Sequence, residues 1–222
     1  MEQAILEFRA VNGSKGKLRL TDINFSLPAG YICGLAGSNG AGKTTLMNYI
    51  LSDKKQYTGN IYLEGKDIHT AREWVKNRIG FVSDDNVFFK EFSASQNAEL
   101  LGRFYEHFDM DFFLDSLKKM EVPSGRIYNK MSRGEKIKFQ LAFAMAHKPV
   151  LYLLDEATAG MDPVFRLDFY RILHRIVEEE NASVLMTTHI ESEITRQTDY
   201  VGIMENGRLI SFGESLDMAL EG

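Results

Sequence analysis

Three features are scarce in this sequence, and each scarcity narrows the possible functions. Cys33 is the single cysteine, so no disulfide can form within the chain, which fits a reducing compartment. The 26 basic side chains are outnumbered by 31 acidic ones, giving a net charge of −5 without a basic cluster, and we expect no nucleic-acid partner. No apolar run reaches the roughly 18 residues of a membrane-spanning helix. Lys148 and Pro149 interrupt the longest candidate.

The beginning of the chain is also poor in the features of an export signal. Residues 1–3 open without the basic and apolar regions of a signal peptide. A length of 222 residues suffices for one sizeable domain with a lobe attached. We therefore expect a single soluble domain over 1–222, located in the cytoplasm, for which any role at a membrane needs another polypeptide.

A glycine-rich loop is the clearest motif that the sequence does contain. It fits the pattern G-x-x-x-x-G-K-[ST] and lies between an apolar, strand-like run at 31–36 and a helix-like run at 46–51. In this context the glycines turn successive backbone N–H groups toward one anion, and the helix adds its positive N-terminal end. Lys43 would reach the β- and γ-phosphates, and the Thr44 hydroxyl would bind Mg²⁺. The predicted nucleotide-binding residues here are Gly37, Ser38, Asn39, Gly40, Ala41, Gly42, Lys43, Thr44 and Thr45.

The order of strand-like and helix-like segments predicts an α/β fold with a parallel sheet. Alternating residues over 2–30, with turn-forming residues at 12–16, indicate an N-terminal β-hairpin. Residues 84–147 read as a helical lobe inserted between segments of the α/β core, 1–83 and 148–222. The expected helices are 71–77, 96–108, 111–120, 132–147, 163–180 and 190–197, and the further strands are 59–67, 79–83, 150–154, 183–187, 201–204 and 209–212.

Two carboxylates and a histidine follow apolar strands. Asp155 and Glu156 end the run 151–154, at the sheet edge where α/β proteins bind ligands. Asp155 suits a magnesium partner, and Glu156 suits the polarisation of an attacking water. Alone, such a pair is more often a solvated turn, but the phosphate loop favours the functional interpretation. His189 follows the strand at 184–188, although a single histidine there is more often structural.

With two further segments, the chain resembles the ATP-binding domain of the ATP-binding-cassette (ABC) family. These segments are residues 131–135 (Met-Ser-Arg-Gly-Glu) and 159–162 (Ala-Gly-Met-Asp). The first segment matches the family signature, the second its D-loop, and His189 its switch histidine. The detailed pattern is most similar to bacterial antibiotic or peptide exporters. The resemblance implies a P-loop NTPase fold of the ABC ATPase type, with ATP and Mg²⁺ as cofactors.

The resemblance further implies a division of roles. Glu156 and His189 would be catalytic, and a head-to-tail dimer would place ATP between one phosphate loop and the partner's signature. The chain would drive a membrane-spanning subunit from the cytoplasmic face, as a homodimer or as a heterodimer with a related ATPase. The residues implied to contact nucleotide across the dimer are Ser132, Arg133, Gly134, Glu135 and Asp162.

The sequence departs from the family pattern at three places. Arg133 replaces the usual glycine and Glu135 the frequent glutamine of the signature, while Ser132 and Gly134 remain. Asp84 stands at the position of the Q-loop glutamine, where a carboxylate can bind Mg²⁺ or hold water. No aromatic residue occupies the expected adenine-stacking position near 11–12, so adenine would rest on an aliphatic surface.

An aromatic segment, 87–92, has two interpretations of equal weight. It falls where relatives receive a segment of the membrane subunit, so part of it would line an exposed groove. Alternatively, its rings pack the two lobes together.

Three functions fit the sequence. The leading one is the ATPase subunit of a transporter. The second is a non-transport ABC ATPase that acts on a soluble assembly. The third is a regulatory module switched by ATP with little hydrolysis, which the altered residue at 84 favours and the presence of Glu156 and His189 opposes.

Overall fold

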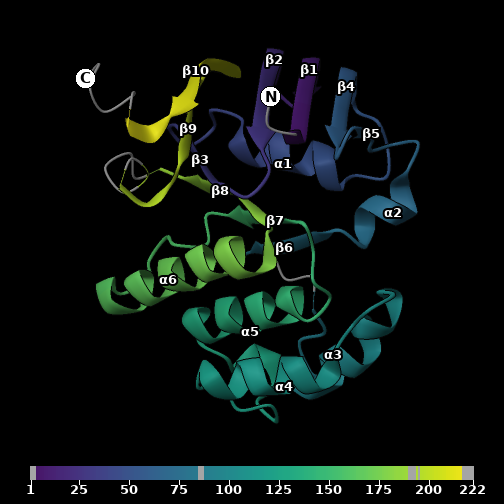
Figure 1. Ribbon diagram of the computed structural model, residues 1–222, viewed down its shortest axis with the longest axis vertical. Coiled ribbons are helices and arrows are strands. Elements are labelled where there is room, and N and C mark those ends of the chain that lie inside the picture. Colours follow the sequence, from purple (N-terminus) through teal and green to yellow (C-terminus); the bar gives the residue numbers. More distant parts are fainter. Residues whose placement is uncertain (1–3, 85–87, 190–193, 195, 217–222) are drawn as a thin grey trace.

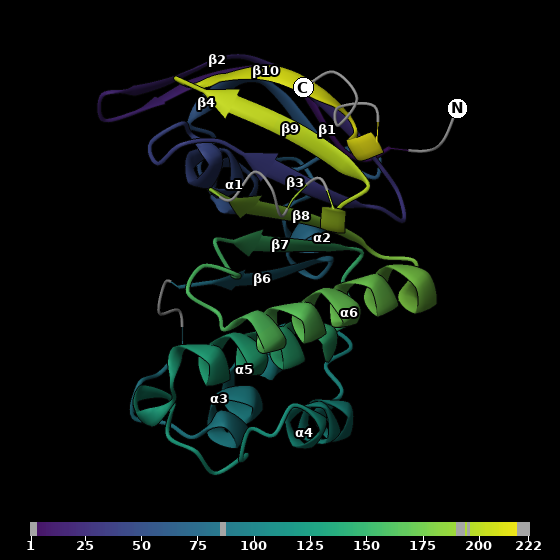
Figure 2. The same ribbon diagram turned by 90° about the vertical axis from the view of Figure 1, so that its left-hand side faces the viewer.

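The computed structural model describes residues 4–84, 88–189, 194 and 196–216. Two β-sheets and a layer of helices are stacked along the long axis of the molecule (Figures 1 and 2). An antiparallel sheet lies at one end, a mostly parallel sheet follows it, and the helices between residues 94 and 145 form the other end. This arrangement confirms the predicted α/β class with a parallel core, an antiparallel β part and a helical lobe. The division of the chain at residues 84 and 147 stays a prediction.

The antiparallel sheet has the order β2-β1-β4-β5. Its strands are β1 (Ala4–Lys15), β2 (Leu18–Pro28), β4 (Tyr57–Leu63) and β5 (Lys66–Asp67). The predicted hairpin is confirmed, but its turn begins later than the predicted 12–16, because β1 continues to Lys15, which pairs with Leu18. Asn12 lies at a register shift, where its side chain donates to the Ala10 carbonyl and accepts from the Asp22 N–H. It therefore satisfies a bulge within the strand rather than forming a turn.

The six-stranded sheet has the order β10-β9-β3-β8-β7-β6 and is parallel except for the pair β9 and β10. Its register aligns Ser83, Asp155 and Thr187 in one row at the carboxyl ends of three neighbouring strands. This row is the sheet edge at which the polar side chains meet. The strands are β3 (Ile32–Ala36), β6 (Ile79–Ser83), β7 (Leu151–Asp155), β8 (Ser183–Thr188), β9 (Tyr200–Glu205) and β10 (Arg208–Glu214).

The helices cover the parallel sheet on both sides. α1 (Lys43–Leu51) packs between the two sheets, and α5 (Arg133–Met145) and α6 (Pro163–Glu180) pack on the opposite side (Figure 2). The remaining helical segments are α2 (Arg72–Lys76), α3 (Ala94–Leu101), α4 (Met110–Lys119) and two short 3₁₀ turns, η1 (Gly102–Phe104) and η2 (Tyr128–Lys130). Among the described residues, no helix combines the length and apolar character that crossing a bilayer requires.

Two helix predictions need comment. The helix predicted over 96–108 is too long, because α3 ends at Leu101 and η1 ends before Tyr105, whose backbone is extended. Gly102 packs against the ring of Phe108, where an added Cβ would lie 2.6 Å from a ring carbon, so the chain folds back at this point. Most of the helix predicted over 190–197 lies outside the described residues.

A cluster of aromatic rings fills the helical lobe. Phe88 is buried, and its ring lies edge-on to those of Phe139 and Phe143, with centroids 4.7 and 5.3 Å away. Phe89 and Phe92 of the same segment are instead partly exposed, and their rings lie against each other. Phe88 thus packs within the helical lobe and also lines a cavity, whereas the exposed Phe89 and Phe92 line none of the cavities described below. The groove interpretation of the segment 87–92 stays a prediction, and Val87 lies outside the described residues.

Candidate functional site

The glycine-rich loop joins the buried strand β3 to helix α1 at the end of the parallel sheet. Gly42 precedes α1 with a φ of 115°, in the region that favours glycine, and no side chain caps this helix. The N–H groups of the first helical turn are therefore available to an anion. Gly37 approaches the chain closely, since a Cβ there would lie 2.2 Å from the Met204 carbonyl oxygen. A cavity of about 200 Å³ opens here, lined by Leu18, Asn39, Gly40, Gly42, Lys43, Thr44, Thr45 and Glu156.

Lys43 is held inside this loop. Its side chain is only 5% exposed, and Nζ donates to the carbonyls of Gly37 and Ser38 at 2.6 and 3.2 Å. Oε1 of Glu156 lies 3.6 Å from the same nitrogen. The ammonium group is thus fixed at the bottom of the cavity, where the phosphates of a nucleotide would replace a weaker set of oxygen partners.

Thr44 and Asp155 meet across the cavity, as the sequence predicts. The Thr44 hydroxyl donates to Oδ1 of Asp155 at 3.1 Å, and the Thr187 hydroxyl donates to the same oxygen at 2.6 Å. The described residues contain no group of three or more His, Cys, Asp or Glu side chains that would hold a metal alone. Mg²⁺ prefers hard oxygen ligands and is commonly held by one or two protein oxygens together with substrate phosphates, so this pair fits it.

Glu156 and His189 also lie together. His189 Nδ1 and Oε2 of Glu156 are 2.8 Å apart, and the Glu156 N–H donates to the Thr187 hydroxyl at 3.0 Å. The backbone of Glu156 has a φ of 51°, a conformation that non-glycine residues adopt at a cost and that recurs at functional sites. The carboxylate is therefore directed by its backbone, by Lys43 and by His189 at the same time.

The signature residues form a helix start some distance from the loop. Ser132 caps α5: its hydroxyl accepts from the Glu135 N–H at 3.2 Å, and the Glu135 carboxylate accepts from the Ser132 N–H at 2.7 Å. This last bond is the main cause that lowers the pKa of Glu135. Glu135 thus completes a capping box, which explains how an acid can replace the usual glutamine. Asp162 in turn caps α6 through the N–H groups of Val164 and Phe165.

These residues surround a second, separate cavity. Its volume is about 190 Å³, and none of its lining residues also lines the cavity at the glycine-rich loop. The glycine-rich loop and the start of α5 therefore line different cavities of one chain. The second cavity is lined by Ser132, Arg133, Gly134, Ile137, Ala157, Ala159, Gly160, Met161, Asp162 and Phe165.

Asp84 follows β6 at the same sheet edge as Asp155. Both of its carboxylate oxygens bind the guanidinium group of Arg133, at 2.8 and 2.6 Å. The proposed role of Asp84 as a magnesium ligand would require this ion pair to open.

The structure adds two residues that sequence reasoning missed. Thr187 bonds to both Asp155 and Glu156, and its place in the aligned row of strand ends was the available signal. Leu18 lines the cavity at the glycine-rich loop as an aliphatic residue, whereas Val11 is fully buried and Asn12 is bound to backbone groups. Its signal was hidden, because only the packing of β2 against the glycine-rich loop brings Leu18 to the cavity: a Cβ on Gly42 would lie 3.6 Å from the Leu18 side chain.

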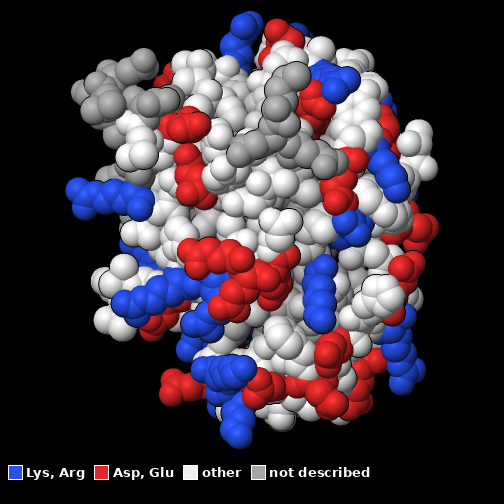
Figure 3. Space-filling view, viewed as in Figure 1, with Lys and Arg blue, Asp and Glu red and all other residues white. Residues whose placement is uncertain are grey.

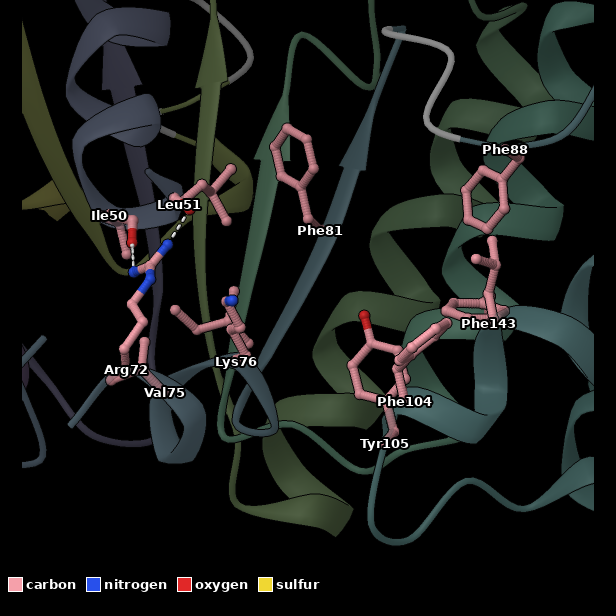
Figure 4. Close-up of a pocket in the computed structure, with 12 residues that line it drawn as sticks. Ile50, Leu51, Arg72, Val75, Lys76, Phe81, Phe88, Phe104, Tyr105 and Phe143 are labelled. Atoms are coloured by element: carbon pink, nitrogen blue, oxygen red, sulfur yellow. Dashed lines mark hydrogen bonds between the residues drawn. The ribbon is translucent and has the colours of Figure 1, made fainter. Parts of the chain in front are cut away.

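A third cavity, of about 340 Å³, lies between the α/β core and the helical lobe. Figure 4 shows Phe81, Phe88, Tyr105 and Phe143 across from Arg72 and its neighbours on α1 and α2. Arg72 donates to the carbonyls of Ile50 and Leu51, which close that side. Phe104 stands at this cavity and is 78% exposed. The cavity is therefore apolar and open, and an aromatic ring exposed to water lies at its rim.

On the face drawn in Figure 3, acidic and basic side chains are interspersed.

Comparison with known proteins places these features in context. A family model described as ABC transporter matches residues 20–159. The chain is similar to the ABC transporter ATP-binding protein YtrB of Bacillus subtilis (strain 168), with 31% identity over 201 residues, 90% of this chain and 68% of that protein. It is also similar to the bacitracin transport ATP-binding protein BcrA of Bacillus licheniformis, with 30% identity over 192 residues, 85% of this chain and 62% of that protein. The chain thus spans about two thirds of the length of these relatives.

A solved structure shares the fold. It is the dimeric post-hydrolysis state of the ATP-binding cassette MJ0796 bound to ADP and Pi, with a TM-score of 0.82 and 20% identity, covering 95% of this chain and 98% of that one.

Proposed function

Because the chain belongs to the ABC transporter family of ATP-binding proteins, we propose that it hydrolyses ATP with Mg²⁺ and thereby drives a separate membrane-spanning subunit. The observation that carries this proposal is a connected set of side chains at one cavity. Lys43, Thr44 and Glu156 line it, Asp155 accepts from the Thr44 hydroxyl, and His189 contacts Glu156. A cation, a magnesium-compatible oxygen pair and an oriented carboxylate are the parts that phosphoryl transfer to water needs.

The residues have distinct roles in this reaction. The loop N–H groups and Lys43 bind the phosphates, with the ammonium group exchanging carbonyl oxygens for phosphate oxygens. Mg²⁺, held by Thr44 and Asp155, would neutralise charge that develops on the phosphates. Glu156 accepts a hydrogen bond from the attacking water and orients it, and His189 holds the Glu156 carboxylate at the required place. ATP and water give ADP and phosphate.

The two separate half-sites support a head-to-tail dimer. Ser132 and the uncommitted N–H groups at the start of α5 form an anion site on the helical lobe, away from the phosphate loop. A second copy would bring this site to the γ-phosphate bound by the first copy. Two-fold symmetry would make the two composite sites equivalent. Asp162 lines the same cavity and would meet the partner there. Since one chain carries both halves, a homodimer is chemically sufficient, and a heterodimer with a related ATPase is the alternative.

The third cavity supports docking of the membrane subunit. It is apolar and lies between the two parts of the molecule, so a segment bound there would contact both of them. The exposed rings of Phe89 and Phe104 are costly in water and fit a hydrophobic partner. In this arrangement the chain is cytoplasmic and peripheral on the membrane. The bacitracin-transport name of BcrA favours transport of an antibiotic or peptide.

One observation favours a second function, an ATP-switched module with little hydrolysis: both oxygens of Asp84 accept hydrogen bonds from Arg133 of the helical lobe. Steady-state ATP hydrolysis with Mg²⁺, by the wild-type chain and by Glu156→Gln, tests the two functions. For a motor we expect turnover that falls at least about a hundredfold in the variant, with ATP-dependent dimers on a sizing column. Equal turnover in both proteins contradicts the role of Glu156. Absence of turnover in wild type supports the switch.

Association tests the transport role itself. Isolation of the chain from membranes together with a membrane-spanning protein would support it. Isolation with a soluble assembly alone would support the non-transport ABC ATPase.

A further inference from the structure

Two of the departures from the family pattern bind each other. Asp84 and Arg133 are 49 residues apart, yet Nε and Nη2 of Arg133 donate to the two oxygens of Asp84 at 2.8 and 2.6 Å. This is the two-point contact for which a guanidinium and a carboxylate are suited. Both departures from the family pattern are thus parts of one ion pair.

The ion pair connects the helical lobe to the sheet edge that carries the catalytic groups. Arg133 is the first residue of α5, and Asp84 directly follows β6, whose last residue pairs with Asp155 of β7. A second contact runs in parallel, since the buried Gln140 side chain of α5 accepts the Ser83 N–H at 3.0 Å. A movement of α5 would therefore be transmitted to the end of β6.

Arg133 also reaches the catalytic carboxylate's own backbone. Its Nη2 donates to the Glu156 carbonyl at 3.3 Å, in the residue that has the unfavourable positive φ. Gly160 leaves room for the guanidinium, because a Cβ there would lie 2.7 Å from Nη1. Asp84 orients the guanidinium, and the guanidinium contacts the strained peptide that directs Glu156.

We propose that Arg133, oriented by Asp84, is a positioning residue that fixes the backbone of Glu156 and makes its placement depend on the position of the helical lobe. The inference rests on the proposed ATPase function and deepens it by naming the residues that transmit lobe movement to the site. Neither side chain needs to touch the nucleotide for this role. Substitution of either residue should therefore change the rate of hydrolysis rather than the affinity for ATP.

A double-mutant cycle tests this role. We would measure kcat, and the Kd for ATP by equilibrium binding, for wild type, Asp84→Asn, Arg133→Gln and the double variant. Each single substitution is expected to lower kcat about tenfold and to change the Kd less than about twofold. The double variant should be no slower than the slower single variant, because both substitutions break one unit.

The matched control is an ion pair with no link to the site. Arg171 and Asp168 of α6 are 2.7 Å apart on the exposed surface. Arg171→Gln and Asp168→Asn should leave kcat unchanged. The Asp84 and Arg133 side chains are 55% and 40% exposed, so their substitution should not prevent folding, which thermal unfolding checks.

Several outcomes overturn the inference. Independent effects of the two substitutions that multiply in the double variant would show that the residues act separately. A loss of kcat in Arg133→Gln that is absent in Asp84→Asn would assign Arg133 to the partner's nucleotide instead. An effect confined to the Kd would also contradict the positioning role.

Hydrogen exchange in the nucleotide-free chain separates this inference from the proposed function. Both single variants should exchange faster over 155–161 than wild type, and the control variants should not. If wild type shows no turnover, the proposed function fails while exchange still decides the inference. Unchanged exchange in both variants overturns it.

Discussion

His189 and Glu156 are in direct contact, with Nδ1 and Oε2 2.8 Å apart. The contact joins the end of β8 to the residue that follows β7, and Glu156 meets Lys43 on its other oxygen. The histidine thus holds one oxygen of the carboxylate while the lysine lies near the other. A carboxylate held from two sides has little freedom to turn away from a water molecule, and this restraint is what the first prediction removes.

Replacement of His189 should slow hydrolysis without weakening ATP binding. In His189→Ala we expect kcat to fall by about ten- to a hundredfold, because Glu156 loses the partner that orients it. Steady-state hydrolysis and equilibrium ATP binding measure the two effects. His174→Gln, on α6, is the matched control and should retain wild-type turnover. A His189 variant that binds ATP poorly but turns over normally at saturation would contradict this role.

Thr187 should matter for both stability and rate. Thr187→Val keeps the side-chain shape but removes the hydroxyl that donates to Asp155 and accepts from the Glu156 N–H. Leaving those buried partners unsatisfied should lower the free energy of unfolding by about 1–3 kcal/mol. Turnover should fall as well. Denaturant unfolding and hydrolysis assays measure this, and Thr58→Val, at an exposed strand position, should change neither. Wild-type stability in Thr187→Val would show that water replaces the hydroxyl.

Phe104 should contribute to partner binding and not to the basal activity. The ring is 78% exposed at the mouth of the apolar cavity, so Phe104→Ser should leave thermal stability and the turnover of the isolated chain unchanged. Co-purification with the membrane subunit should decrease. Ile210→Ser, also exposed but on β10, is the control for a general loss of surface hydrophobicity. Equal co-purification of both variants with the subunit would remove Phe104 from the docking surface. Phe88→Ala suits this test less, because Phe88 is buried in the lobe core.

His147 should make the helical lobe sensitive to acid. Burial against Tyr105 lowers the pKa of His147, and both ring nitrogens lie near backbone carbonyls. The unfolded chain therefore binds a proton at a higher pH than the folded chain. It follows that stability is constant above a pH of about 6.5 and decreases as the pH falls below it. His147→Gln should flatten this part of the stability curve, while His107→Gln, at an exposed site, should not. An unchanged slope in His147→Gln would assign the acid sensitivity to other groups.

The sequence predicts best those features that depend on local pattern. The apolar run at 151–154 followed by two acids located β7 and the polar edge of the sheet, and the glycine-rich loop located the cavity. The capping box of Ser132 and Glu135 was not predicted, although its residues are three apart along one helix and its pattern is local. Short-range spacing and backbone chemistry are sufficient in these cases.

Features that depend on distant residues could not be predicted. Nothing local in the sequence shows that Asp84 and Arg133 meet, because each is only an isolated charge until β6 and α5 are packed together. The hairpin turn was misplaced for a related reason: Asn12 favours turns, but here its side chain satisfies a bulge that the pairing with β2 creates. Leu18 was missed because its contact with the glycine-rich loop arises from long-range packing that no local pattern shows.

The separation of the two half-sites within one chain has a kinetic consequence. If each ATP must be enclosed by two copies, the specific activity of the purified protein rises with its own concentration until the dimer is fully formed. A membrane complex that holds two copies side by side would raise their effective concentration far above that in dilute solution. Free chains would then hydrolyse little ATP, and most hydrolysis would occur where two copies are already held together at the membrane.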